Sequence, residues 1–86
     1  MTYRVEFSKR AANQLKSLSR HVQVRLKPAI DGLAEEPRPD GVVKLKGEEN
    51  AYRVRVGDYR IVYEVRDNVL LVLIVKIGHR REIYRK

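Results

Sequence analysis

The sequence contains no cysteine and no tryptophan, and it has only three prolines, five glycines and one phenylalanine among its 86 residues. The lack of cysteine excludes disulfides and thiolate metal sites. The glycines are scattered, so there is no glycine-rich loop of the kind that cradles phosphates. The only histidines, His21 and His79, lie far apart, without carboxylates at metal-ligand spacing. We therefore expect neither a metal nor another cofactor.

The N-terminal segment lacks the apolar run of a secretory signal, because residues 1–10 already carry several charges. We expect a cytoplasmic protein with no membrane partner. The length is that of one domain, since independent domains run from about 50 to 250 residues. We accordingly treat residues 1–86 as a single unit.

Positive charge is the first informative feature that is present. Nineteen lysines and arginines face eleven acidic residues, which gives a formal net charge of +8. The excess is +3 in residues 1–50 and +5 in the shorter segment 51–86. Such a balance favours a polyanionic partner, RNA, DNA or an acidic protein, over a merely soluble cationic surface.

Apolar spacing predicts an α+β fold with the order β-α-α-β-β-β-β. Val5 and Phe7 alternate with charged residues, which indicates a short strand, and Ser8 is a plausible helix N-cap. Helical spacing then continues through two helices towards residue 35, with Pro28 expected to kink or break the second helix. Short alternating or apolar runs follow at residues 42–45, 52–56, 59–65 and 69–77. We expect two N-terminal helices packed on one face of a mainly antiparallel sheet.

The clearest pattern is a β-hairpin around Gly57-Asp58. If these two residues form the turn, Arg55 lies directly opposite Arg60 on the face away from the core, with Arg53 two residues along. Like charges at such a spacing repel one another, and arginine binds phosphate oxygens with its planar fork. The hairpin therefore predicts a solvent-side anion site, although long arginines can also extend separately into water.

A second two-residue turn is expected at Asp67-Asn68, which would place Arg60 opposite Val75. The chain would then leave the sheet beside the arginines, in the segment from Lys76 to Lys86, which has five basic residues against one acid and includes His79, Arg80 and Arg81. Tyr84 offers a ring on which an RNA base could stack, or it could instead anchor the tail to the core. His79 could titrate near neutral pH beside the arginines.

The hairpin block from Ala51 to Val65 and the segment Gly78-His79-Arg80-Arg81-Glu82-Ile83-Tyr84 resemble the RelE/ParE toxin superfamily, and more narrowly RelE. The segments at residues 7–11, 37–39 and 44–47 fit the same family in the same order, so the resemblance covers nearly the whole chain. It implies a fold similar to the small microbial ribonucleases. It also implies a toxin that cuts mRNA in the ribosomal A site without a metal, through attack of a ribose 2′-hydroxyl.

Carried over by position, the resemblance makes Arg60 and Arg80 phosphate-stabilising residues and Tyr84 the residue that positions or stacks on mRNA. Arg53 and Arg55 stand where well-known members carry lysines. Arginine is effectively never neutral, so these two residues are expected to stabilise charge, and base catalysis falls to His79 or to positioning alone. The expected catalytic and RNA-binding set is Arg53, Arg55, Arg60, His79, Arg80, Arg81 and Tyr84.

The resemblance further implies two partners, a RelB-like antitoxin, and mRNA in the A site with the surrounding ribosomal RNA. An alternative is a ParE-like toxin that binds DNA gyrase and is not a nuclease. A non-catalytic RNA- or ribosome-binding module is a third possibility. The set of Arg60, Arg80 and Tyr84 with the basic pair at 53 and 55 favours the nuclease, because a gyrase-binding toxin does not need these residues on one face.

Overall fold

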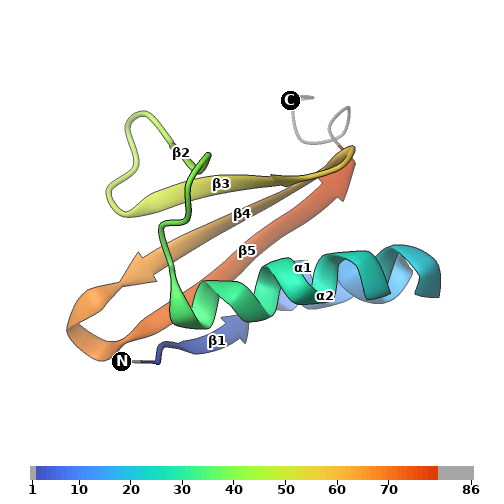
Figure 1. Cartoon of the computed structure of the whole chain (residues 1–86), viewed down its shortest axis with the longest axis horizontal. Helices are drawn as coiled ribbons and strands as arrows, with labels where there is room; N and C mark the ends of the chain where they lie inside the picture. The colour runs from blue at the N-terminus through green and yellow to red at the C-terminus, as the bar shows by residue number, and fades with distance from the viewer. Residues whose placement is uncertain (1, 80–86) are drawn as a thin grey trace.

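A computed structural model describes residues 2–79 of the chain. Over this range the chain forms one five-stranded sheet and two helices, and the helices lie between the first strand and the other four strands along the chain (Figure 1). The elements in chain order are β1 (Arg4–Phe7), α1 (Lys9–Ser17), α2 (Arg20–Glu35), β2 (Val43–Lys44), β3 (Ala51–Val56), β4 (Tyr59–Arg66), the 3-10 helix η1 (Asp67–Val69) and β5 (Leu71–His79). The expected order β-α-α-β-β-β-β is confirmed.

The strands lie in the order β1-β5-β4-β3-β2, so the last strand of the described chain sits beside the first. β1 pairs with β5 in parallel, whereas the other neighbours are antiparallel. Both helices lie on the same side of this sheet (Figure 1). We call the opposite side, which neither α1 nor α2 covers, the open face.

Serine side chains start both helices. The Ser8 hydroxyl accepts from the Ala11 amide at the start of α1, and the Ser19 hydroxyl accepts from the Val22 amide at the start of α2. These contacts satisfy amides that have no partner within a helix. The expected break at Pro28 is wrong, because α2 continues through it. Pro28 lies on the exposed side of α2, where water can solvate the carbonyl that proline leaves without a donor.

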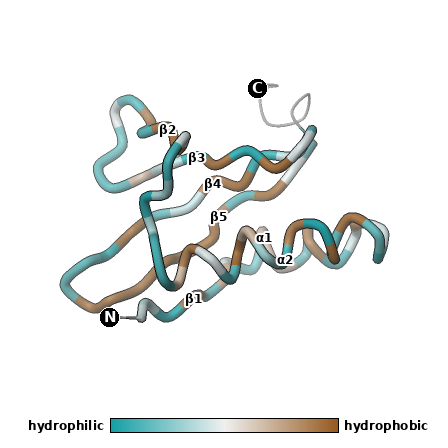
Figure 2. Tube along the Cα trace, in the orientation of Figure 1, coloured by the Kyte–Doolittle hydropathy of each residue, from teal (hydrophilic) through white to brown (hydrophobic). Residues whose placement is uncertain are grey.

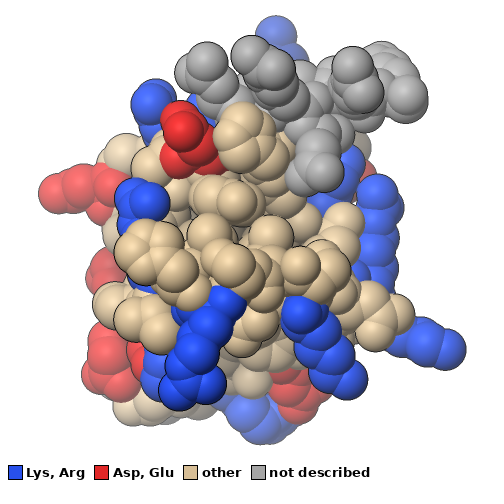
Figure 3. Space-filling model, turned by 90° about the vertical axis from the view of Figure 1, so that its right-hand side faces the viewer, with Lys and Arg blue, Asp and Glu red and all other residues tan. Residues whose placement is uncertain are grey.

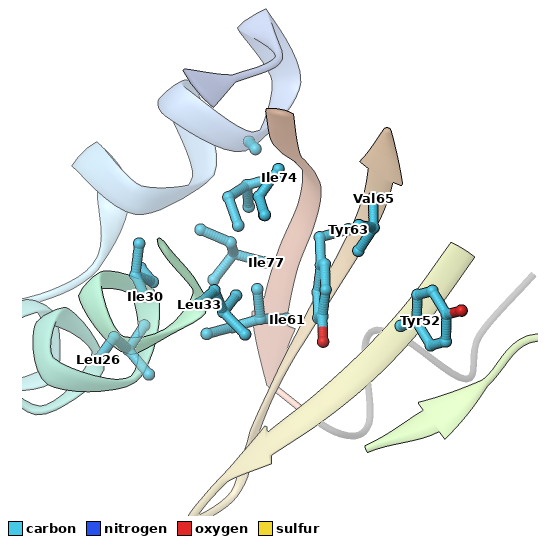
Figure 4. Packing of buried hydrophobic residues seen from close by; sticks show 11 residues of the cluster. Leu26, Ile30, Leu33, Tyr52, Ile61, Tyr63, Val65, Ile74 and Ile77 are labelled. Atoms are coloured by element: carbon cyan, nitrogen blue, oxygen red, sulfur yellow. The ribbon is translucent and has the colours of Figure 1, made fainter. Parts of the chain in front are cut away.

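The core fills the space between the helices and the sheet. Ile61, Tyr63 and Val65 of β4 are completely buried, which confirms the alternation expected for this strand. They meet Leu26, Ile30 and Leu33 of α2 and the inward side chains of β5 (Figure 4). Figure 2 shows apolar stretches along β5 and alternating apolar and polar residues along the helices and the hairpin strands, as expected for elements with one buried face.

The connection between β4 and β5 differs from the expected turn. Asp67-Asn68 is not a two-residue hairpin turn, because the chain forms η1 there and Leu70 adopts a left-handed conformation with φ of 50°. A bulge lies farther along, since Val62 pairs with Lys76 and Tyr63 with Ile74, so that Val75 has no partner on β4. Arg60 consequently lies opposite Gly78 rather than Val75.

The β4–β5 connection is tied to distant parts of the chain by a hydrogen-bonded cluster that we call the clasp, formed by Tyr3, Arg38, Tyr52 and Asp67. The two terminal nitrogens of Arg38 donate hydrogen bonds to the Asp67 carboxylate, Nη2 to Oδ2 at 2.8 Å and Nη1 to Oδ1 at 3.2 Å. Its Nε donates to the Tyr52 hydroxyl at 2.9 Å. The Tyr3 hydroxyl donates to Asp67 Oδ1 at 2.5 Å. The clasp thereby joins the N-terminus, the segment after α2, β3 and η1.

Candidate nucleic-acid interface

Basic side chains gather along the row of residues that crosses the open face from β3 to β5. Arg53 pairs with Val62, and Val62 pairs with Lys76, so a single valine separates the two basic positions. A hollow of about 520 Å³ lies over this row. Its lining residues are Arg10, Leu45, Lys46, Glu48, Arg53, Val62, Val75 and Lys76. Four basic side chains and one acidic side chain thus surround a space large enough for part of a polyanion.

The next row confirms the hairpin register expected from the sequence. Arg55 lies opposite Arg60, and Gly57 occupies the turn with a positive φ of 59°. The guanidinium of Arg25 lies so close that a Cβ on Gly57 would come within 2.7 Å of Nη2. The positive φ favours glycine at this turn, whereas the Arg25 guanidinium is the flexible end of an exposed side chain and could move aside for a larger residue.

Arg60 differs from the solvent-side arginine that the sequence predicted. It is only 7% exposed, whereas Arg55 across from it is exposed. Its other register partner is Gly78, which has no side chain to compete for the same space. Burial strengthens the interaction of a cation with any anion that approaches it, because less water screens the charge. Arg60 is thus a firmly placed charge beside the exposed Arg55.

His79 lies at the end of β5 and on the other side of the sheet from Arg53 and Lys76. It pairs with Tyr59, and the two rings meet edge to face with centroids 5.5 Å apart. A smaller hollow of about 320 Å³ brings His79 and Tyr59 together with Arg25 and Arg55. The hairpin end therefore contains a second basic group, next to the turn at Gly57.

The structure therefore divides the predicted residues between two adjoining groups. Arg53 lines the open-face hollow, whereas Arg55 and His79 line the smaller hollow at the hairpin end. Arg60 pairs with Arg55 on one side and with Gly78 on the other. Arg80, Arg81 and Tyr84 lie outside the described residues. Figure 3 looks onto the end of the molecule where β5 stops and β3 turns into β4, and basic side chains, with acidic ones among them, border a surface of uncharged residues there.

Sequence reasoning did not assign Lys76, Arg10, Lys46 or Arg25 to the site, although Lys76 begins the basic segment that it placed beside the arginines. Lys76 sits in an almost continuously apolar stretch, so alternation gave no sign of the face on which it lies. Arg10 and Arg25 reach the site from helices, and Lys46 reaches it from the loop after β2. An excess of basic residues was the only signal for these positions.

Within residues 2–79, no group of three or more histidine or acidic side chains is arranged to hold a metal ion. No helix in that range is long and apolar enough to cross a membrane.

The family model described as the ParE toxin of type II toxin-antitoxin systems, parDE, matches residues 5–84. The chain belongs to this toxin family. Within it, the similarity is to the RelE type. The chain is 31% identical to the mRNA interferase toxin RelE of Escherichia coli K12, covering 98% of this chain and 92% of that protein. It is 32% identical to the toxin RelE3 of Methanocaldococcus jannaschii, covering 94% of each chain.

Solved structures of RelE toxins share the fold. The archaeal RelE–RelB complex from Pyrococcus horikoshii OT3 contains a chain that superposes with a TM-score of 0.81 at 36% identity, covering 93% of this chain and 97% of that one. A chain of the intact E. coli RelBE toxin–antitoxin complex superposes with a TM-score of 0.80 at 27% identity, covering 92% and 96%. The chain is a RelE-type toxin, and its α+β fold is that of these structures.

Proposed function

We propose that this toxin is a ribosome-dependent endoribonuclease that cuts mRNA in the ribosomal A site and so stops translation. The observation that carries the proposal is the gathering of Arg53, Arg60 and further basic side chains along the open face and the hairpin end. The similarity to a toxin named as an mRNA interferase supports RNA as the polyanion.

The proposed reaction is attack of a ribose 2′-oxygen on the adjacent phosphorus. The new P–O2′ bond forms a 2′,3′-cyclic phosphate while the P–O5′ bond breaks. The 2′-hydroxyl loses a proton, the leaving 5′-oxygen gains one, and negative charge grows on the phosphorane in between. Arg60, with Arg80, is proposed to stabilise that charge, because preorganised cations act most strongly where water is excluded.

Arg53 and Arg55 are proposed to bind and orient the RNA backbone. Neither is a plausible base, since a guanidinium does not lose its proton in proteins. His79 stays the candidate for proton transfer, at the hairpin end next to Arg55. Arg81 and Tyr84 are proposed to hold the RNA, with the Tyr84 ring stacking on a base.

Primer-extension mapping of an mRNA, with and without purified ribosomes, tests the function. We expect new 5′ ends at codons in the A site only when ribosomes are present, and 2′,3′-cyclic phosphate on the upstream product. A triple substitution of Arg53, Arg55 and Arg60 to glutamine is the control and should give no cuts. Absence of cuts by the wild type, together with inhibition of DNA gyrase, would favour the ParE-like alternative.

We further propose that an antitoxin of the RelB kind restrains this toxin, as the complexes of similar chains suggest. A hollow of about 470 Å³ lies between β1, α1 and α2, and apolar side chains, among them Val5, Phe7 and Leu15, form much of its lining. Val24 beside it is 61% exposed. Such a groove fits the apolar stripe of an amphipathic helix, while the net charge of +8 attracts an acidic chain.

Binding of the co-encoded antitoxin to a Val24→Lys variant tests this partner surface. A charge in the groove should raise the dissociation rate, whereas Lys16→Gln on the exposed side of α1 should leave it unchanged. High salt should slow association of the wild type and leave the complex assembled, because apolar contacts are not screened. Unaltered dissociation of Val24→Lys would place the antitoxin elsewhere.

A further inference from the structure

Lys76 reaches the open face only because β5 contains a bulge. Ile74 is completely buried on the core side, so strict alternation would also turn Lys76 towards the core. Val75 is the extra residue of the bulge, and after it the alternation is reversed. Ile77 is buried instead, with 2% exposure, and Lys76 pairs with Val62 on the open face.

Side chains of α1 and its N-cap hold the backbone of β5 on both sides of Lys76. The Ser8 hydroxyl donates to the Val75 carbonyl at 3.2 Å, and Gln14 Oε1 accepts from the Ile77 amide at 2.7 Å. β1 ends at Phe7, opposite Ile74, so α1 takes over this edge where β1 stops. The bulge is therefore braced by hydrogen bonds from outside the sheet.

The surroundings of Lys76 are strongly basic. It shares the open-face hollow with Arg10, Lys46 and Arg53, while Glu48 is the one acidic residue of the lining. Lys76 is half-buried and lines the hollow, which is typical of a lysine whose aliphatic stem is packed while its ammonium group reaches solvent. Like charges held together in this way are stabilised by a bound polyanion, whose phosphates replace the counterions that would otherwise be needed.

We propose that Lys76 is a phosphate-binding residue of the toxin's RNA site, and that Gln14 is the positioning residue that fixes the strand segment presenting it. The proposal rests on the proposed function, since RNA is taken as the polyanion. It adds a contact from β5 to those from β3 and β4. A bound strand would then cross all three strands on the open face.

Binding of a short fluorescent 2′-O-methyl RNA tests the role of Lys76 separately from cleavage, because the blocked 2′-oxygen cannot react. Lys76→Gln should reduce the slope of log affinity against log salt by about 0.7, which is the value for one contact with single-stranded nucleic acid. The ratio of wild-type to variant affinity should therefore be about fivefold larger at about 0.1 M salt than at about 1 M salt. Lys27→Gln, which removes the same charge from the exposed side of α2, is the matched control.

An unchanged slope and affinity in Lys76→Gln, with salt-sensitive binding by the wild type, would overturn the inference and leave the proposed function standing. Failure of the wild type to bind this free RNA would also overturn the inference, whereas the proposed function is judged separately, by the mapping of cuts in the presence of ribosomes. A normal melting temperature of Lys76→Gln is expected, because the lysine is on the open face and outside the core cluster.

A double-mutant cycle tests the positioning role of Gln14. Gln14→Met keeps the length of the side chain but removes the acceptor for the Ile77 amide, so hydrogen exchange at that amide should accelerate and RNA binding should weaken. In the Lys76→Gln background the same change should cost no further affinity, because its effect passes through Lys76. Additive losses, or unchanged binding by Gln14→Met with faster exchange at Ile77, would overturn the positioning role.

Discussion

The clasp and the open-face hollow both contain arginine, yet their charges are arranged in opposite ways. At the clasp, Arg38 is held by an acid and a tyrosine hydroxyl, and its guanidinium also lies 5.2 Å from the centroid of the Tyr52 ring. At the hollow, four basic side chains share the lining with a single acid. The first arrangement satisfies charge within the chain, whereas the second leaves an excess that an external anion can neutralise.

The pKa values at the clasp reflect this internal pairing. The hydrogen bonds from Arg38, with a further one from Tyr3, lower the pKa of Asp67 to about 2. The hydrogen bond to Asp67 in turn raises the pKa of Tyr3. Beside the clasp, burial raises the pKa of Tyr63, whose hydroxyl donates to the Pro37 carbonyl at 2.8 Å, to about 12. The difference between the two regions indicates that the clasp stabilises the fold and that the open face is available for function.

The largest effect that would test this division is expected at Arg60. Arg60→Met retains an unbranched apolar stem in the buried position but removes the guanidinium. Single-turnover cleavage of ribosome-bound mRNA should slow by about 100- to 1,000-fold, the usual cost of losing one preorganised group that stabilises a transition state. Antitoxin binding should be retained, because the apolar groove lies on the helical side.

Arg66→Met on the same strand is the control for Arg60→Met. Arg66 is exposed and donates to Glu64 at 2.8 Å, so its loss removes a surface ion pair of little energetic value. Cleavage by this variant should stay near the wild-type rate. If Arg60→Met cut mRNA at the normal rate, or lost activity only in proportion to unfolded protein, the phosphate-stabilising role of Arg60 would be refuted.

The hairpin with its arginine pair could be predicted from the sequence because it depends on local rules. Gly57-Asp58 specifies the turn, and alternation along β3 and β4 then determines which residues face one another. These two local features suffice to place Arg55 opposite Arg60, as the register confirms. The cap at Ser8 is equally local, and it is confirmed too.

The β4–β5 connection could not be predicted in the same way. Asp67-Asn68 has the composition of a two-residue turn, but η1 forms there, and Asp67 is engaged by Arg38 and Tyr3 from distant parts of the chain. The bulge at Val75 is likewise braced by Ser8 and Gln14. Both corrections arise from tertiary contacts, which the local pattern of residues does not encode. They explain why the partner of Arg60 was misplaced and why Lys76 was missed.

A smaller effect, on stability alone, is expected at Tyr63 beside the clasp. Tyr63→Phe keeps the buried ring but leaves the Pro37 carbonyl without its hydrogen bond. The free energy of unfolding, measured with urea, should fall by about 1–2 kcal/mol, the cost of an unmade buried hydrogen bond. Cleavage by the folded variant should be unchanged. A loss of activity beyond the loss of folded protein would contradict the separation of the two regions.

The smallest effect is expected at Asp67, whose side chain is exposed, so that water screens its ion pair with Arg38. The destabilisation caused by removing this charge should be present at neutral pH and should shrink as the solution is acidified. A carboxyl whose pKa is lowered by folding stabilises the protein above its ordinary pKa, and that contribution disappears as the pH falls through the native value. For Asp67 this window runs from about pH 4 to about pH 2. Asp67→Asn retains the shape but cannot titrate, so the melting temperature of this variant should fall less steeply with acid than that of the wild type.

Glu6→Gln on β1, which removes an exposed carboxylate paired with Arg4, is the matched control and should follow the wild-type curve closely. If the two variants had the same acid profile as the wild type, the charge of Asp67 would contribute nothing to the clasp, and the contrast with the open face would rest on geometry alone.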